Sequence, residues 1–148
     1  MIVLNGVALT PDLSGALYWA DTRTLVVADL HFEKASHFAA RGQHIPRYDT
    51  AVTLAALTEV IDRRAPDRVI CLGDSFHDPE AGERLEPENA TALRALTARA
   101  DWIWVAGNHD PAPPEGLGGA VVHDFCLGPL TFRHIADPKA RAGEISGH

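Results

Sequence analysis

Several segments of the sequence combine carboxylate, amide and imidazole groups, which are side chains that bind divalent metals. In chain order these residues are Asp29 and His31 in ADLH, Asp74 in LGD, Asn108 with His109 and Asp110 in GNHD, then His134 and His148. Oxygen and imidazole donors of this kind suit Mn, Fe or Zn, and the lack of thiolates in the set argues against a soft-metal site. The donor set predicts a centre for two divalent metal ions, most readily Mn, in which one carboxylate bridges the ions.

Three of these segments follow β-like runs, in VVADLH, VICLGD and IWVAGNHD. The carboxyl ends of parallel strands lie along one edge of a sheet, where ligands bind. Residues two apart on a strand face the same way, so Asp29 and His31 are expected to converge. Each segment alone is a weak signal, because Asn and Gly also favour turns. Their joint occurrence, in order and with helix-sized segments between them, favours a shared site.

The remaining pattern predicts an α/β domain. Two antiparallel strands are expected in the first 19 residues, with a turn signal at Asn5-Gly6, followed by a strand over 24–28. Apolar periodicity and stop signals predict helices over 34–42, 49–64 and 87–100. Strands are expected over 68–73 and 101–107, and a closing hairpin over 120–127 and 130–134. Strand and helix alternate in the middle and strands lie at both ends, which predicts a mixed sheet or two packed sheets.

Composition narrows the class of protein. A chain of 148 residues predicts one domain, 1–148. The formal net charge is −7 and no basic patch is evident, so a Lys/Arg surface for nucleic acid is not expected. No apolar run is long enough for a membrane span, the start lacks the features of a secretory signal, and Cys71 and Cys126 are expected to be buried free thiols. These features predict a cytoplasmic protein without a membrane partner, and they leave its oligomeric state open.

The motif series DLH at 29–31, GD at 73–74, GNHD at 107–110, His134 and GH at 147–148 resembles that of the calcineurin-like metallophosphoesterases. The stretches ADLHFEKASHFAARG, CLGDSFHD and WIWVAGNHDPAPP resemble the DNA ligase-associated subgroup of bacteria, which is linked to helicase and ligase partners in DNA repair. The resemblance covers about residues 24 to 148. It implies a β-sandwich of mixed sheets flanked by helices, and two bound divalent metal ions.

The resemblance also implies a role for each residue. Asp29 and His31 would bind the first metal, Asp74 would bridge, and Asn108, His134 and His148 would bind the second. His109 would contact the substrate phosphate and protonate the leaving oxygen, while Asp110 would orient His109. The family pattern ends in G-H-x-H, whereas this sequence stops at the first of these histidines. We therefore expect a domain that is incomplete at the C-terminus, either because the sequence is truncated or because the protein is naturally short. In both cases only Asp29, His31 and Asp74 remain at the first metal, and we expect weaker binding there.

The expected activity is hydrolysis of phosphodiester bonds, as in a DNA-repair nuclease, by attack of a hydroxide that bridges the two metals. Lys34, His77 and Asp78, together with Asn108, are expected to contact the substrate, whereas His37 is expected to be a surface residue. Two alternatives stay open. The ligands do not encode substrate size, so a phosphomonoesterase or small-nucleotide diesterase fits them as well. A metal-free scaffold or binding module is the other alternative.

Overall fold

The structure is a computed structural model that describes residues 1–43, 48–107 and 111–148. It contains two β-sheets. The large sheet has seven strands in chain order: β1 (Ile2–Leu4), β2 (Val7–Pro11), β3 (Leu17–Trp19), β4 (Thr24–Val27), β5 (Arg68–Cys71), β6 (Asp101–Val105) and β7 (Ala120–Val122). Its first four strands are antiparallel neighbours, and β4 to β7 run parallel to one another. The small sheet, in the order β10-β9-β8, consists of β8 (Asp124–Leu127), β9 (Leu130–Arg133) and β10 (Glu144–Ser146).

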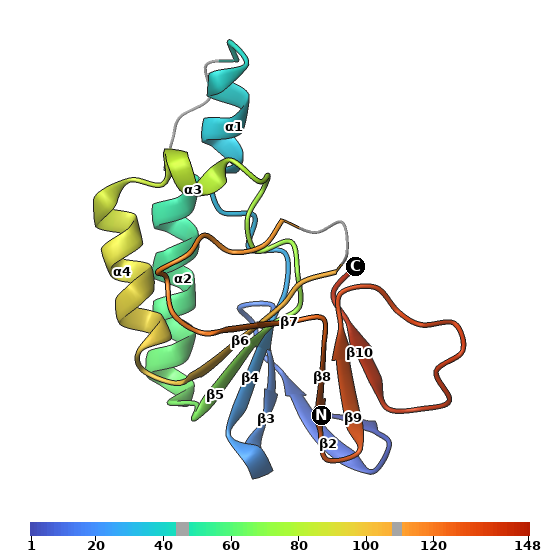
Figure 1. The fold of residues 1–148 in the computed structure, drawn as a ribbon. Coiled ribbons are helices and arrows are strands. Elements are labelled where there is room, and N and C mark those ends of the chain that lie inside the picture. The colour runs from blue at the N-terminus through green and yellow to red at the C-terminus, as the bar shows by residue number, and fades with distance from the viewer. Residues whose placement is uncertain (44–47, 108–110) are drawn as a thin grey trace.

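Helices cover one face of the large sheet, and the small sheet lies on the other side (Figure 1). The helices are the 3-10 turn η1 (Ala20–Thr22), α1 (Lys34–Ala40), α2 (Asp49–Arg64), α3 (Ala81–Arg84) and α4 (Pro87–Thr97). α2 turns Leu54, Leu57, Val60 and Ile61 toward the core, the spacing of one face of a helix. Among the described residues, no helix is both long and apolar enough to cross a membrane.

Alternation along the parallel strands creates two hydrophobic cores. On β5, Val69 and Cys71 join the core beneath the helices. Ile70 and the following Leu72 join the core between the sheets, which Leu130 and Phe132 of β9 complete. β4, β5 and β6 are therefore buried on both faces, which agrees with the expected mixed α/β architecture of packed sheets flanked by helices.

The chain ends differ in detail from the prediction. Asn5 and Gly6 both have positive φ and turn the first apolar run into the β1–β2 hairpin. The expected hairpin strand 120–127 is wrong as a single strand, because it divides at His123 between the two sheets. β7 pairs with β6 in the large sheet, while β8 pairs with β9 in the small one. β10 and the short α3 were not expected, and Cys126 is exposed, not buried.

Candidate metal centre

The loops after β4 and β5 carry the first three candidate ligands in a left-handed backbone conformation. The φ angles are 56° at Asp29, 48° at His31 and 48° at Asp74. Asp29 and His31 do converge, with His31 Nε2 lying 3.8 Å from Asp29 Oδ1. They lie beyond the end of β4, however, so the predicted reason is wrong: their convergence comes from the turn of the loop and not from alternation along a strand.

Backbone hydrogen bonds hold these two loops against each other. The His31 N–H donates to the Asp74 carbonyl at 2.8 Å, and the Asp29 N–H donates to the Gly73 carbonyl at 3.3 Å. After the loops, Phe32 and Phe76 form an isolated parallel bridge. The centroids of their buried rings lie 5.4 Å apart. Paired backbone therefore flanks the two loops on both sides: β4 pairs with β5 before them, and Phe32 pairs with Phe76 after them. This pairing fixes three unfavourable backbone conformations that each cost about 1–3 kcal/mol.

The candidate ligands form two groups that share Asp74. Asp29, His31 and Asp74 offer donor atoms that all lie within 4.8 Å of one another, and so do Asp74, His134 and His148. A carboxylate common to two groups of ligands is the arrangement that a bridged pair of metals needs. Asn108, His109 and Asp110, for which the sequence predicts a ligand and two catalytic roles, lie outside the described residues.

The backbone just after β5 holds His134 in an orientation suited to a metal ligand. Its buried ring donates from Nδ1–H to the Leu72 carbonyl at 3.0 Å. In the neutral ring this bond fixes the tautomer and leaves Nε2 as an electron-pair donor. Nε2 faces the centre, 3.8 Å from Asp74 Oδ1. A hydrogen bond on the far nitrogen is typical of a metal-binding histidine, so this residue fits a metal.

Gly147 brings His148 to the same place. The Gly147 and His148 N–H groups donate to the His134 carbonyl at 3.2 and 2.9 Å. A Cβ on Gly147 would clash with the Leu72 carbonyl oxygen and would lie 2.8 Å from the Leu72 Cβ. Only glycine allows this close approach, so the GH dipeptide is a steric requirement of the site as well as a source of a ligand.

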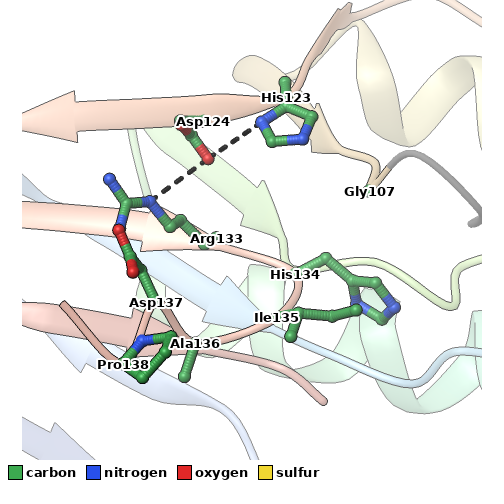
Figure 2. A pocket seen from close by; sticks show the side chains of 9 residues that line it. All are labelled: Gly107, His123, Asp124, Arg133, His134, Ile135, Ala136, Asp137 and Pro138. Carbon is green, nitrogen blue, oxygen red and sulfur yellow. Dashed lines mark hydrogen bonds and ion pairs between the residues drawn. The ribbon is translucent and has the colours of Figure 1, made fainter. Parts of the chain in front are cut away.

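A pocket of about 420 Å³ opens beside His134, between Gly107 and the loop after β9 (Figure 2). Figure 2 shows Asp124 between His123 and Arg133. Arg133 also pairs with Asp137 at 3.3 Å and with Glu144 at 2.6 Å. Three carboxylates therefore surround this one guanidinium, and the described residues of the pocket offer no excess positive charge to a phosphate.

Asp78 lies in a buried ion-pair network instead of facing open solvent. Its carboxylate is 2.6 Å from Arg84 Nη2 and 2.7 Å from His37 Nδ1. The Arg84 hydrogen bond is the main reason that the pKa of Asp78 is held well below its usual value. Arg84 continues to Ser36 Oγ at 2.9 Å and to the Glu33 carbonyl at 3.2 Å. The network thus joins α1, α3 and the loop after β5.

The roles of Glu33 and Arg84 and the partly buried position of His37 were not predicted. Glu33 is 4% exposed, and its carboxylate accepts hydrogen bonds from Thr50 and Ser36. An acid beside a short helix normally indicates a solvated surface, so no local pattern identifies it. The signal that was available is the charged pair Asp78 and Arg84, six residues apart on either side of an Ala-Gly pair.

The other two predicted substrate contacts differ in their surroundings. Lys34 is exposed at the first residue of α1. The centroid of the His77 ring lies 5.9 Å from that of the His31 ring and 4.6 Å from that of the His37 ring. Burial, followed by the nearby His37 and His31, lowers the pKa of His77. His77 is therefore adjacent to the centre, whereas Lys34 is placed to meet solvent.

Comparisons with known proteins agree with this geometry. A family model described as "Calcineurin-like phosphoesterase" matches residues 22–143. An Arabidopsis thaliana protein described as "Probable inactive purple acid phosphatase 29" is 23% identical over 124 residues, which are 80% of this chain and 31% of the relative. The chain thus spans about a third of that curated relative. The crystal structure of Pseudomonas putida nuclease MPE is 26% identical, with a TM-score of 0.78, and the match covers 98% of this chain and 70% of that chain.

Proposed function

Because the chain belongs to the calcineurin-like phosphoesterase family, we propose that it is a metal-dependent phosphodiesterase that acts as a nuclease. The family uses divalent metals and hydrolyses phosphoesters, and the similar solved structure is that of a nuclease. The observation that carries the proposal is the position of Asp74. Its carboxylate lies in both groups of candidate ligands, so this one side chain would connect two adjacent metal ions.

The residues divide between the two positions as follows. Asp29 and His31 would hold one ion, His134 and His148 the other, and Asp74 both. The sequence adds Asn108 to the second position. When bound, two divalent ions neutralise phosphate oxygens and make water acidic enough to act as a nucleophile near neutral pH. Nitrogen and oxygen donors without thiolate favour Mn, with Fe or Zn as the other metals of this class.

The chain's own groups supply orientation and proton transfer. His134 is held by the Leu72 carbonyl and directs Nε2 inward. His109, with Asp110 as its hydrogen-bond acceptor, is proposed to protonate the leaving oxygen, a step typically worth about 10²–10⁴-fold. A separate nucleophilic side chain is not required, since water is the attacking group.

Charge explains why metal dependence should be strict. The protein carries a formal charge of −7, and Arg133 beside the centre is surrounded by Asp124, Asp137 and Glu144. An anionic ester therefore gains little attraction from this arginine. Bound cations invert the local electrostatics of such a site. We accordingly expect the protein without metal to bind phosphodiesters very weakly.

The wider setting belongs to the same proposal. The sequence resemblance implies a role in DNA repair, with a DNA ligase and a helicase as partners, and the composition predicts a cytoplasmic location. We expect affinity-tagged protein to recover both from the cells that encode it, under conditions in which a surface-charge control protein recovers neither. Recovery of neither partner would remove the repair setting and leave the phosphodiesterase proposal intact.

Metal analysis and hydrolysis together test the proposal. In buffer that keeps Mn saturating, which the weaker first position requires, elemental analysis should find two ions per chain above the buffer background. The loaded protein should cleave bis-p-nitrophenyl phosphate and single-stranded DNA. Asp74→Asn should lower turnover by at least about 100-fold, because metal stabilisation of the transition state is worth several kcal/mol.

The same measurements decide between the alternatives. Faster cleavage of mono- than of bis-p-nitrophenyl phosphate would favour a phosphomonoesterase, an activity class named in the description of the Arabidopsis relative. A protein that gains no Mn, Fe or Zn would favour the metal-free scaffold and would contradict the proposed function.

A further inference from the structure

We propose that a pocket between the β2–β3 loop and α2 binds the uncharged ring of one ester arm of the substrate, a nucleobase or an aryl group; this inference rests on the proposed phosphodiesterase function. The pocket, called here the ring pocket, has a volume of about 320 Å³. The pocket is lined by residues 14–16 of the β2–β3 loop, by residues 27–30 at the end of β4 and in the loop after it, and by Val52, Thr53, Ala56, Leu57 and Val60 of α2.

The ring pocket begins at the candidate metal centre. Asp29 lines it and is also a member of the first group of candidate ligands. One ester arm of a phosphate held at the centre would then lie near this pocket. Ligand pockets for small molecules range from about 300 to 1,000 Å³. A volume of about 320 Å³ suits a single ring system and its linkage, and not several nucleotides.

The chemistry of the walls favours an uncharged ring. Aliphatic side chains dominate, and Leu57 and Val60 are buried at 3% and 2% exposure. Besides Asp29, the polar side chains among the described lining residues are Ser14 and Thr53. The Ser14 hydroxyl already donates to Asp12 Oδ1 at 2.8 Å. The walls thus lack both a cation for a second phosphate and the set of donors and acceptors needed to distinguish one base from another.

The pocket beside His134 has more charged side chains. Its lining includes Asp124, Arg133 and Asp137, next to Ile135, Ala136 and Pro138. A phosphodiester has two arms, and the two pockets adjoin the centre at Asp29 and at His134 respectively. An apolar ring gains from burial on the Asp29 side and would strip water from charged groups on the His134 side. We therefore expect the ring in the ring pocket, where the described lining residues carry no charge besides Asp29.

Two neighbouring alanines on α2 provide a matched test. Ala56 and Ala55 are both exposed residues in the middle of this helix, but only Ala56 lines the ring pocket. Ala56→Trp places an indole in the pocket, whereas Ala55→Trp places the same group on the helix surface outside it. For bis-p-nitrophenyl phosphate with saturating Mn, Ala56→Trp should raise KM at least about tenfold, as expected when a well-filled apolar pocket is blocked. Ala55→Trp should retain the wild-type KM, and both variants should bind the same amount of Mn.

A direct binding measurement accompanies the kinetics. In the zinc-loaded protein, titration with thymidine 5′-monophosphate should shift the NMR methyl signals of Val52, Ala56 and Leu57, and should leave the methyl signal of Ala55 in place. If the wild type cleaves the diester but both tryptophan variants have equal KM values and the pocket methyl signals do not move, the ring pocket is overturned and the phosphodiesterase stands. If the wild type cleaves no diester at all, the proposed function fails, and the titration alone then supports or overturns the pocket.

Discussion

Replacement of Asp78 by asparagine distinguishes a structural role for this residue from the substrate contact that the sequence predicts. The Asp78 carboxylate accepts from both terminal nitrogens of Arg84, at 2.6 and 3.0 Å, and lies 2.7 Å from His37 Nδ1. It also accepts from the Glu80 N–H at 2.9 Å. The asparagine side chain would keep a similar shape and one acceptor oxygen, but the replacement would remove the negative charge beside Arg84. The structure therefore predicts a loss of stability and no direct loss of substrate affinity.

The size of this loss follows from the burial of the pair. The side chains of Asp78 and Arg84 are 11% and 18% exposed. Removal of one partner from a fully buried ion pair costs about 3–5 kcal/mol. Partial exposure lowers this figure, and Arg84 keeps its bonds to Ser36 and the Glu33 carbonyl. We expect Asp78→Asn to lower the free energy of unfolding by about 2–3 kcal/mol, or Tm by about 5–10 °C for a chain of this length.

Urea unfolding of the wild type and the variant at neutral pH measures this difference. Asp101→Asn is the matched control: Asp101 Oδ2 lies 3.0 Å from Arg68 Nε, but its side chain is 59% exposed. That replacement should cost no more than about 1 kcal/mol. Because the pKa of Asp78 is depressed, its stabilisation is present above the unfolded pKa of about 3.9 and is lost as the pH falls through the folded value. The gap between wild type and Asp78→Asn should therefore narrow below about pH 4.

Enzyme kinetics test the alternative, in which Asp78 contacts the substrate. If Asp78→Asn unfolds at the wild-type urea concentration while KM for a phosphodiester rises tenfold or more, Asp78 contacts the substrate. The network with Arg84 and His37 would then be a minor contribution to stability, and the reasoning from burial would be refuted. A folded variant with wild-type KM and reduced stability supports the structural role.

Three further predictions concern the metal centre. His134→Gln should reduce the Mn content from two ions to one per chain by elemental analysis, whereas His123→Gln, which alters an exposed ring, should keep both. Gly147→Ala places a Cβ against the Leu72 carbonyl oxygen and should displace His148, so the same analysis should find weaker retention of the second ion. Removal of metal with EDTA should lower Tm by about 5–10 °C relative to protein with Mn at 100 times its Kd. Binding at that concentration adds about 2.7 kcal/mol to the free energy of unfolding. An unchanged Tm would contradict a preformed metal site.

The sequence predicts the middle of the fold better than its ends. α2 spans Asp49–Arg64, as its periodicity indicates, because a long amphipathic helix carries its own signal. The run 120–127 has no such signal at His123, where it passes from one sheet to the other. β8 pairs with β9 across a two-residue turn, as the expected hairpin requires. β7 pairs with β6, which lies earlier in the chain across a long connection, so a local pattern does not contain this partner. β10 is hidden for the same reason, since it pairs in parallel with β9 across a loop.

At the candidate site, too, the sequence predicts the residue types but not the distant contacts that orient them. Strand ends that finish in polar residues indicate where the ligands meet, and the structure brings Asp29, His31, Asp74, His134 and His148 together. The orientation of each ligand depends on contacts that are remote in sequence. His134 is held by a carbonyl 62 residues away, and Glu33 by a hydroxyl 17 residues away. Residue types can be read from the sequence, whereas such partners require the tertiary structure.

The left-handed backbone at Asp29, His31 and Asp74 connects folding to function in this protein. Each of these residues carries a Cβ, so each conformation is unfavourable on its own. They persist because β4 and β5 pair below the loops and Phe32 and Phe76 pair above them, so relaxing one φ angle would break hydrogen bonds between the loops. The strain is thus offset by the sheet, and the three side chains are already gathered before any ion arrives. A centre built in this way would lose little conformational entropy when it binds metal, which is the physical reason to expect the metal at these loops and not at the exposed acids elsewhere on the surface.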